Sequence, residues 1–216
     1  MNFTVDRPSV HRGESVTLSW EILGASQAFL SYVGTVGTTG SVIVRPEQTT
    51  TYALLADTSS GLVARSVTVE VAGSGRGDEF PLNAEDFKYP LTTTTKIGFA
   101  NLATIVHSVL QDQMHLSVKK VEYLPDHEQL VFVTSRARDQ SLLKPGEPRI
   151  GERRVAYLVT IERGIKDGTL DYTVRTLVEY RLRVEETWRP EQSEDLYTSS
   201  GADVRSRIEN NLKSQQ

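Results

Sequence analysis

The chain has 216 residues, of which 38% are hydrophobic and 24% are charged, and its formal net charge at pH 7 is −4. This length exceeds the usual size of one domain, so it predicts two domains that each bury a core. The charge is spread evenly, with four arginines against six acids in residues 1–73, which argues against a nucleic-acid-binding protein.

Cysteine is absent, which excludes disulfides, thiolate metal sites and cysteine nucleophiles. No segment is apolar over the length that a bilayer requires. The chain opens on Met1 and Asn2 without the pattern of a signal peptide. We therefore expect either a cytoplasmic protein or an exported one in which Met1 stands at the start of the already matured form.

Residues 1–72 are predicted to form a small β-sandwich. Short β-rich runs are separated by turn residues at the spacing of a sandwich, at 3–5, 15–22, 28–32, 40–44, 50–57 and 64–71. Apolar residues alternate with polar ones in two of these runs, which predicts a core-facing side in each. These predicted core residues are Val16, Leu18, Trp20 and Ile22 in one run, and Val67, Val69 and Val71 in the closing strand.

The same residues resemble a known family. The stretches that carry the likeness are Gly13–Trp20, Gly34–Val36, Gly40–Val42, Val44–Pro46 and Thr49–Leu54. They are similar to the bacterial immunoglobulin-like repeats of envelope and surface proteins. The resemblance implies a seven-stranded sandwich that acts as a spacer or adhesive module, is usually exported, and has no catalytic residues to carry over.

Residues 73–80 are predicted to be a Gly-rich linker, since Gly73–Asp78 has three glycines in six residues. A dinucleotide-binding loop is rejected, because no helical pattern follows and Pro81 comes soon after. The tripeptide Arg76-Gly77-Asp78 is also the one that integrin ligands display on exposed loops. Coincidence in a Gly-rich linker is the favoured explanation for it.

Residues 81–216 are predicted to form an α+β domain. Apolar spacing predicts one helix over 98–115 and another that begins at Ser200, with Asp203 in the capping position. Strands are predicted at 86–92, 117–124, 129–136, 153–162 and 170–184. These strands would form an antiparallel sheet with both helices on one face and a charged opposite face. In the order of its elements alone, this resembles the helix-grip and related folds of small outer-membrane assembly lipoproteins.

No catalytic, cofactor-binding or metal-binding grouping is predicted. The histidines lack the spacing of metal ligands, since His107 and His115 would lie about 12 Å apart along one helix. The acids between Glu185 and Asp195 are interpreted as part of a solvated loop, and only a cleft that held two of them near His127 would favour a hydrolase. We therefore expect no enzyme, no cofactor and no metal.

The candidate site is a surface for a partner. Arg175, Arg181 and Arg183 share the charged strand face, and Arg153 is assigned beside them on the neighbouring strand. An ordinary salt-bridged strand face is the alternative interpretation, because the acidic residues Asp171 and Glu179 interrupt these arginines. Trp188 beside Arg189 is interpreted either as an interaction anchor or as a plug at the end of the core.

These patterns predict a non-enzymatic interaction or scaffold protein of the bacterial periplasm or outer cell envelope. We expect it to bind a protein partner in the envelope and to be attached to the membrane, if at all, through a removed N-terminal segment. One alternative is a glycan-binding or adhesive module, which needs an exposed platform of aromatic residues such as Tyr32, Tyr157 or Trp188. A hydrolase with an unfamiliar site is the less favoured alternative.

Overall fold

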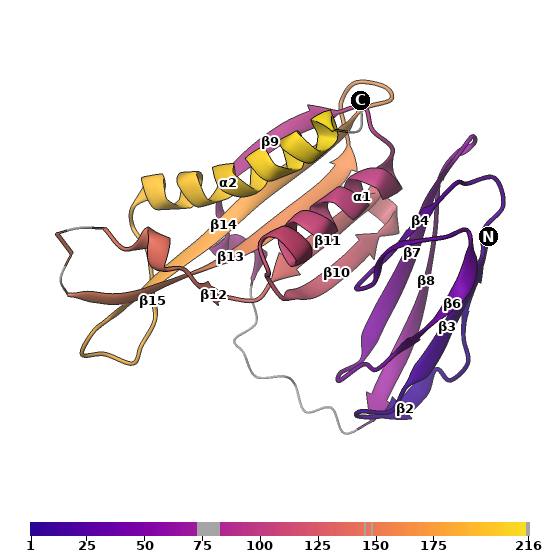
Figure 1. The fold of residues 1–216 in the computed structure, drawn as a ribbon, viewed down its shortest axis with the longest axis horizontal. Coiled ribbons are helices and arrows are strands. Elements are labelled where there is room, and N and C mark those ends of the chain that lie inside the picture. Colours follow the sequence, from indigo (N-terminus) through magenta and orange to yellow (C-terminus); the bar gives the residue numbers. More distant parts are fainter. Residues whose placement is uncertain (73–82, 145, 148, 215–216) are drawn as a thin grey trace.

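The computed structural model describes residues 1–72, 83–144, 146–147 and 149–214. Within these ranges the protein is mostly β-structure with two α-helices (Figure 1). The N-terminal part forms a β-sandwich, and the C-terminal part forms one sheet with both helices on the same side. The segment 73–80, with Arg76-Gly77-Asp78, lies outside the described residues.

Two sheets enclose the apolar core of the sandwich. One has the order β1-β3-β6, with bounds Asn2–Val5, Val16–Glu21 and Thr39–Val44. The other has the order β2-β8-β7-β4-β5, with bounds Ser9–His11, Gly61–Ala72, Thr50–Thr58, Ala28–Leu30 and Gly34–Val36. The strands of both sheets pair antiparallel except for β2, which pairs parallel with β8. The predicted alternation in β3 is confirmed, because Val16, Leu18 and Trp20 are all buried. The short strands β2 and β5 were not predicted, since three residues are too few to show a period.

The C-terminal sheet has the central order β10-β11-β13-β14 and is antiparallel throughout. Its main strands are β10 (Val118–Leu124), β11 (Gln129–Thr134), β13 (Ile150–Arg163) and β14 (Leu170–Leu182). Strands β9 (Lys88–Thr95) and β15 (Arg189–Pro190) both pair with β14, and β12 (Ala137–Arg138) pairs with β13. The predicted hairpin is confirmed, and a short 3-10 turn at Pro125–His127 joins its two strands.

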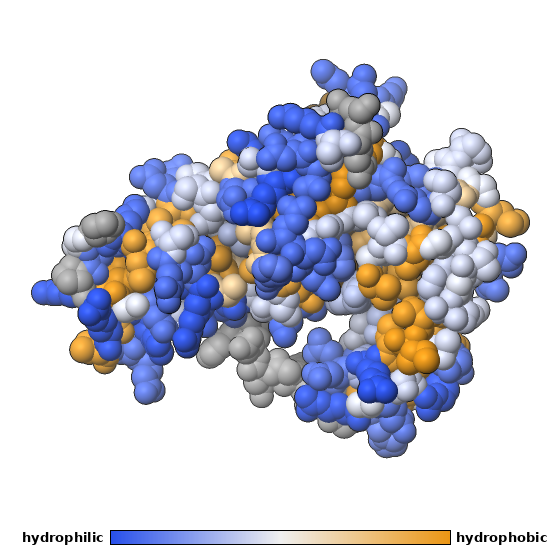
Figure 2. Space-filling view, viewed as in Figure 1, coloured by the Kyte–Doolittle hydropathy of each residue, from blue (hydrophilic) through white to orange (hydrophobic). Residues whose placement is uncertain are grey.

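Both helices pack on one face of this sheet, as predicted. Helix α1 (Phe99–Ser108) continues through a π-helical turn at Val109–Gln113, and helix α2 comprises Glu194–Lys213. Their apolar residues join one hydrophobic cluster with the inward residues of β13 and β14. The helices present mostly hydrophilic residues to solvent on this side (Figure 2).

The predicted start of the second helix was wrong. Ser200 does not cap α2 but is buried in its middle, and the helix begins six residues earlier at Glu194. Leu196 and Tyr197 are buried, so they extend the apolar stripe of the helix toward its N-terminus. Glu194 and Asp195 lie in the first turn, where negative charge stabilises a helix, so this end of the predicted solvated loop is helical.

Helix α1 lies between the C-terminal sheet and the sandwich (Figure 1). Phe29, Ala53 and Leu55 of the sandwich belong to the same buried cluster as the apolar face of α1. Asp57 of β7 accepts hydrogen bonds from the first free amides of the helix, at 2.9 Å from Phe99 N and 2.8 Å from Ala100 N. A carboxylate at that position satisfies amides that lack a partner within the helix. The sandwich therefore supplies both the cap of α1 and part of its apolar surroundings.

His107 of α1 faces the sandwich and is 5% exposed. Its ring contacts Phe29 edge-on, with ring centroids 5.7 Å apart, and its Nε2 atom has no hydrogen-bond partner within the described residues. Burial lowers the pKa of His107, against a smaller opposing effect of Asp112. The neutral imidazole is thus the form that fits this interface.

We expect the stability of the protein to fall as the pH drops below about 6.5, the ordinary pKa of histidine, toward the lower folded-state pKa of His107. In that interval the unfolded state binds the proton that the folded state excludes. The free energy of unfolding therefore decreases as the pH falls. Urea denaturation at a series of pH values should show a weaker dependence in His107→Gln. The matched control is His127→Gln in the exposed turn, and an equal loss of the dependence in that variant would contradict the assignment.

Candidate interaction surface

The strand register of β13 and β14 builds the candidate surface on the face opposite the helices. Arg154 is opposite Glu179, and Glu152 is opposite Arg181. Opposed residues of neighbouring strands point to the same side of a sheet, so the four charged side chains gather at one end of the outer face. This end is the one where β15 joins β14.

Ion pairs connect these side chains into a cluster. Glu179 Oε2 lies 2.7 Å from both Arg136 Nε and Arg154 Nε. Glu152 lies 2.6 Å from Arg181 and 3.3 Å from Arg138. Four arginines meet two glutamates, so the cluster carries a formal net charge of +2.

Trp188 covers this cluster. The chain turns after β14, and β15 returns beside it with Arg189 opposite Tyr180, which places Trp188 next to Arg181. The guanidinium carbon of Arg154 lies 4.1 Å from the centroid of the Trp188 ring, and that of Arg181 lies 5.4 Å away. Both distances are in the range of a cation–π contact. We call Trp188, the four arginines and the two glutamates the Trp188 surface.

The central part of the outer face is apolar and covered, which the sequence did not predict. Leu177 of β14 packs with Ala156 and Leu158 of β13, and Phe87 lies over them at 4% exposure. The outer face therefore combines this apolar centre with charged residues around it. The interpretation of Trp188 as a core plug is wrong, because Trp188 is half-buried on this outer face beside arginines.

Arg153 does not belong to the predicted arginine patch. It lies on the helix-bearing side, where its side chain is 1% exposed and forms ion pairs with Glu191 at 2.9 Å and Glu147 at 2.8 Å. Its NH1 group also donates to the carbonyl of Leu142 at 2.8 Å. Desolvation acts to lower the pKa of Arg153, but the two carboxylates outweigh it and raise the pKa.

The other predicted site residues are spread along the sheet. Arg181 is part of the Trp188 surface, whereas Arg175 lies farther along β14, opposite Leu158. Arg183 is exposed beyond the end of β14, and Arg189 pairs with Glu185 at 2.7 Å. The structure therefore brings Arg181 and Trp188 together, with Arg189 next in sequence, and leaves Arg175 apart.

Sequence reasoning missed most of the charged residues at the centre of the site. Arg136, Arg138, Arg154 and Glu152 were not singled out, although Arg154 and Glu152 alternate along β13. Glu179 was taken as an interruption of the patch, and it is the residue that holds two of the arginines. The alternation of charge in both strands of one hairpin was the available signal.

The acids of 185–195 that the sequence singled out lie in different surroundings. Glu191 is held by Arg153, Glu185 pairs with Arg189, and Asp195 lies in α2. His127 sits in the β10–β11 turn, at the end of the sheet away from β15. Among the residues that the structure describes, no group of three or more His, Asp or Glu side chains could hold a metal ion.

The three aromatic residues given as examples for a glycan platform lie apart. Tyr157 is 2% exposed on the helix-bearing side, and burial raises its pKa. The hydroxyl of Tyr32 accepts a hydrogen bond from Val121 N at 3.2 Å, where the sandwich meets β10. Of these three residues only Trp188 lies on the outer face, so they do not form a platform together.

None of the helices in the described ranges is both long enough and apolar enough to cross a membrane. No protein-family model matches the sequence, and a search of curated proteins returns no significant match.

Proposed function

We propose that this chain is a non-enzymatic interaction or scaffold protein of a bacterial cell envelope, and that it binds an acidic region of a protein partner through the Trp188 surface. The observation that carries the proposal is the aromatic ring held by two arginines in a cluster of net charge +2. Tryptophan and arginine are the residues most enriched among those that dominate binding energy at protein interfaces.

The surroundings of the ring favour binding to a protein. Arg154, Arg181 and their glutamate partners are paired, so they hold the ring in one position before a partner arrives, and less side-chain entropy is lost on binding. Val184 in the same loop is 93% exposed and adds an apolar contact at the rim. The excess positive charge would draw an acidic partner and reject a basic one.

The envelope assignment rests on the likeness of residues 1–72 to bacterial immunoglobulin-like repeats. In this role the sandwich positions the C-terminal sheet, because it caps and covers helix α1 on the face opposite the Trp188 surface. The proposed partner would then approach the face that the sandwich and helices leave free.

We expect Trp188→Ala to weaken binding of the partner by about 2 kcal/mol or more, the loss typical of a central interface residue. The full chain would be chemically cross-linked in a cell-envelope fraction, the captured protein identified, and its affinity for purified variants measured by calorimetry. Arg181→Ala should weaken the same complex, and the affinity should fall with added salt.

The matched control is Ile165→Ala, since Ile165 is fully exposed in the turn between β13 and β14, away from Trp188. A partner bound equally well by the wild type, Trp188→Ala and Arg181→Ala would contradict the proposed surface. Turnover of a substrate by the purified chain would contradict the non-enzymatic assignment.

A further inference from the structure

Strand β9 is an open edge of the C-terminal sheet. It pairs with β14 on one side, and within the described ranges no strand pairs with its other side. Its regular pairing runs from Leu91 to Thr95, after an irregularity near Pro90. A bare strand edge presents a row of main-chain donors and acceptors that another strand satisfies.

The opposite edge of the sheet is not equally available. The sandwich lies beside β10, and the amide of Val121 on that side already donates to the Tyr32 hydroxyl at 3.2 Å. No described residue covers strand β9 in this way, and along it Thr92 and Thr94 are exposed while Leu91, Thr93 and Thr95 are half-buried. Threonine has a high propensity for strands, so the edge is already in the conformation that pairing needs.

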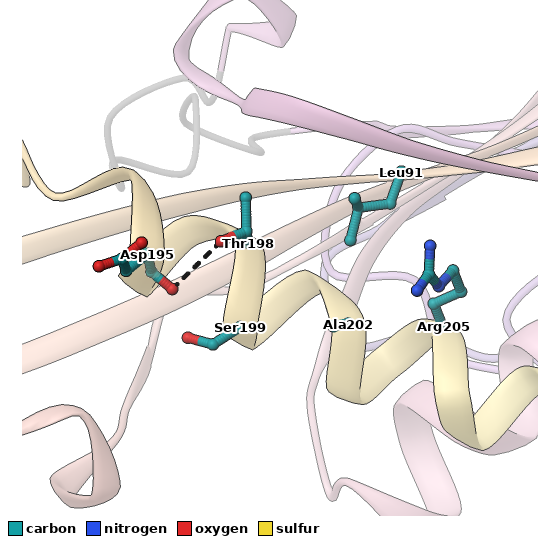
Figure 3. Close-up of a pocket in the computed structure, with 6 residues that line it drawn as sticks. All are labelled: Leu91, Asp195, Thr198, Ser199, Ala202 and Arg205. Carbon is teal, nitrogen blue, oxygen red and sulfur yellow. Dashed lines mark hydrogen bonds between the residues drawn. The ribbon is translucent and has the colours of Figure 1, made fainter.

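A shallow, open groove of about 490 Å³ lies between Leu91 of β9 and helix α2 (Figure 3). Leu91 and Ala202 form its apolar part, Asp195 lies toward the N-terminal end of α2, and Arg205 lies farther along the helix. Gly201 lets α2 approach the sheet closely, since a Cβ atom at that position would lie 2.9 Å from Thr176 Oγ1. Ala202, the next residue, lines the groove. A side chain that projects from a strand added to β9 would reach this groove.

We propose that β9 and the groove beside α2 bind an extended polypeptide segment of another protein, which adds to the sheet as a further strand. Main-chain hydrogen bonds to β9 would provide affinity, and an apolar side chain over Leu91 and Ala202 would provide specificity. This site goes beyond the proposed function, because it lies at the sheet edge on the helix side, away from the Trp188 surface.

The charges at the ends of β9 indicate which segment fits. Lys88 and Lys96 are exposed and flank the open edge, so they favour a segment with an acidic residue at each end. Antiparallel pairing of β9 with a second copy of this chain would gather four lysines, Lys88 and Lys96 of each molecule, along one short edge. An acidic segment would instead place opposite charges beside the two lysines of one molecule, so the proposed occupant is a different polypeptide.

The test uses the full chain and a synthetic peptide of alternating valine and threonine with an aspartate at each end. Hydrogen–deuterium exchange should show that amides of Leu91–Thr95 become protected when the peptide is added, while those of β10 do not change. The same peptide with alternate amides methylated cannot pair along that edge, and it should give no protection.

The groove is tested by Ala202→Arg, which fills it while keeping a good helix former. Affinity for the peptide, measured by fluorescence anisotropy, should fall about tenfold even though the variant adds a positive charge. Ser206→Arg is the control, since it adds the same charge at an exposed position of α2 and should not weaken binding.

Three outcomes would overturn the proposal. They are absence of β9 protection at saturating peptide, equal protection by the methylated peptide, and unchanged affinity in a folded Ala202→Arg variant. Sedimentation of the free chain as a dimer with β9 already protected would assign the edge to self-association instead.

Discussion

Arg153→Met is expected to lower the free energy of unfolding by about 3 to 5 kcal/mol, the cost of breaking a buried ion pair by removing one partner. The side chains of Arg153 and Glu191 are 1% and 9% exposed, so solvent screens their attraction little. Without the guanidinium, the buried Glu191 carboxylate loses its cation and the Leu142 carbonyl loses a donor. Urea denaturation followed by circular dichroism would measure the loss.

The matched control for this prediction is Arg183→Met, which removes the same charge from an exposed position just beyond β14. We expect it to change the free energy of unfolding by no more than about 0.5 kcal/mol. The double variant Arg153→Met with Glu191→Met should recover part of the loss, because it removes the more buried of the two carboxylates that Arg153 pairs with and leaves only Glu147, whose side chain is 37% exposed. A single Arg153→Met variant as stable as wild type would show that the pair is solvated in solution.

The face on which Arg153 lies could not be read from its sequence. A strand exposed on one side shows a period of two, but β13 is buried at seven consecutive positions, from Val155 to Ile161. Phe87 covers Ala156 and Leu158 on the outer face, while the helices cover the other. Burial on both faces removes the alternation by which a residue is assigned to one side. In β3 only one face is buried, and its core residues were predicted correctly.

The contact between the sandwich and α1 has a signature in the sequence of β7 that the predictions above do not include. Tyr52–Ala56 is a continuous apolar run in β7, and all five residues are buried. A strand with one solvated face would alternate, so this run indicates a second covering layer. The sequence alone could not identify that layer as α1, because the contact joins residues more than forty positions apart.

The start of α2 and the position of Trp188 depend on tertiary contacts. Helix α2 begins at Glu194 because Leu196 and Tyr197 find apolar partners on the sheet, and the Tyr197 hydroxyl donates to the Val178 carbonyl at 3.1 Å. Trp188 reaches Arg154 only because β15 turns back along β14. Two residues of β15 carry no recognisable strand pattern, so this return was not predictable.

Leu55→Ala is expected to lower the free energy of unfolding by about 2 to 5 kcal/mol, the usual effect of truncating a fully buried leucine. Leu55 is 0% exposed and packs in the cluster that joins the sandwich to α1 and the C-terminal sheet. Because that cluster is continuous, we expect sandwich and sheet to unfold together. The loss of stability should therefore be seen by a spectroscopic probe in the C-terminal sheet, far from the substitution.

The two tryptophans of the chain supply such probes, since Trp20 lies in the sandwich core and Trp188 on the C-terminal sheet. In a Trp20→Phe background the fluorescence of Trp188 reports the C-terminal part alone. Leu54→Ala is the matched control, because Leu54 is equally buried but faces the core between the two sheets of the sandwich. If the chain unfolds as one unit, both variants shift the Trp188 transition to lower urea. If Leu54→Ala does not change the urea concentration at which Trp188 reports unfolding, the sandwich unfolds on its own. The contact between the sandwich and α1 then joins two parts that are stable separately.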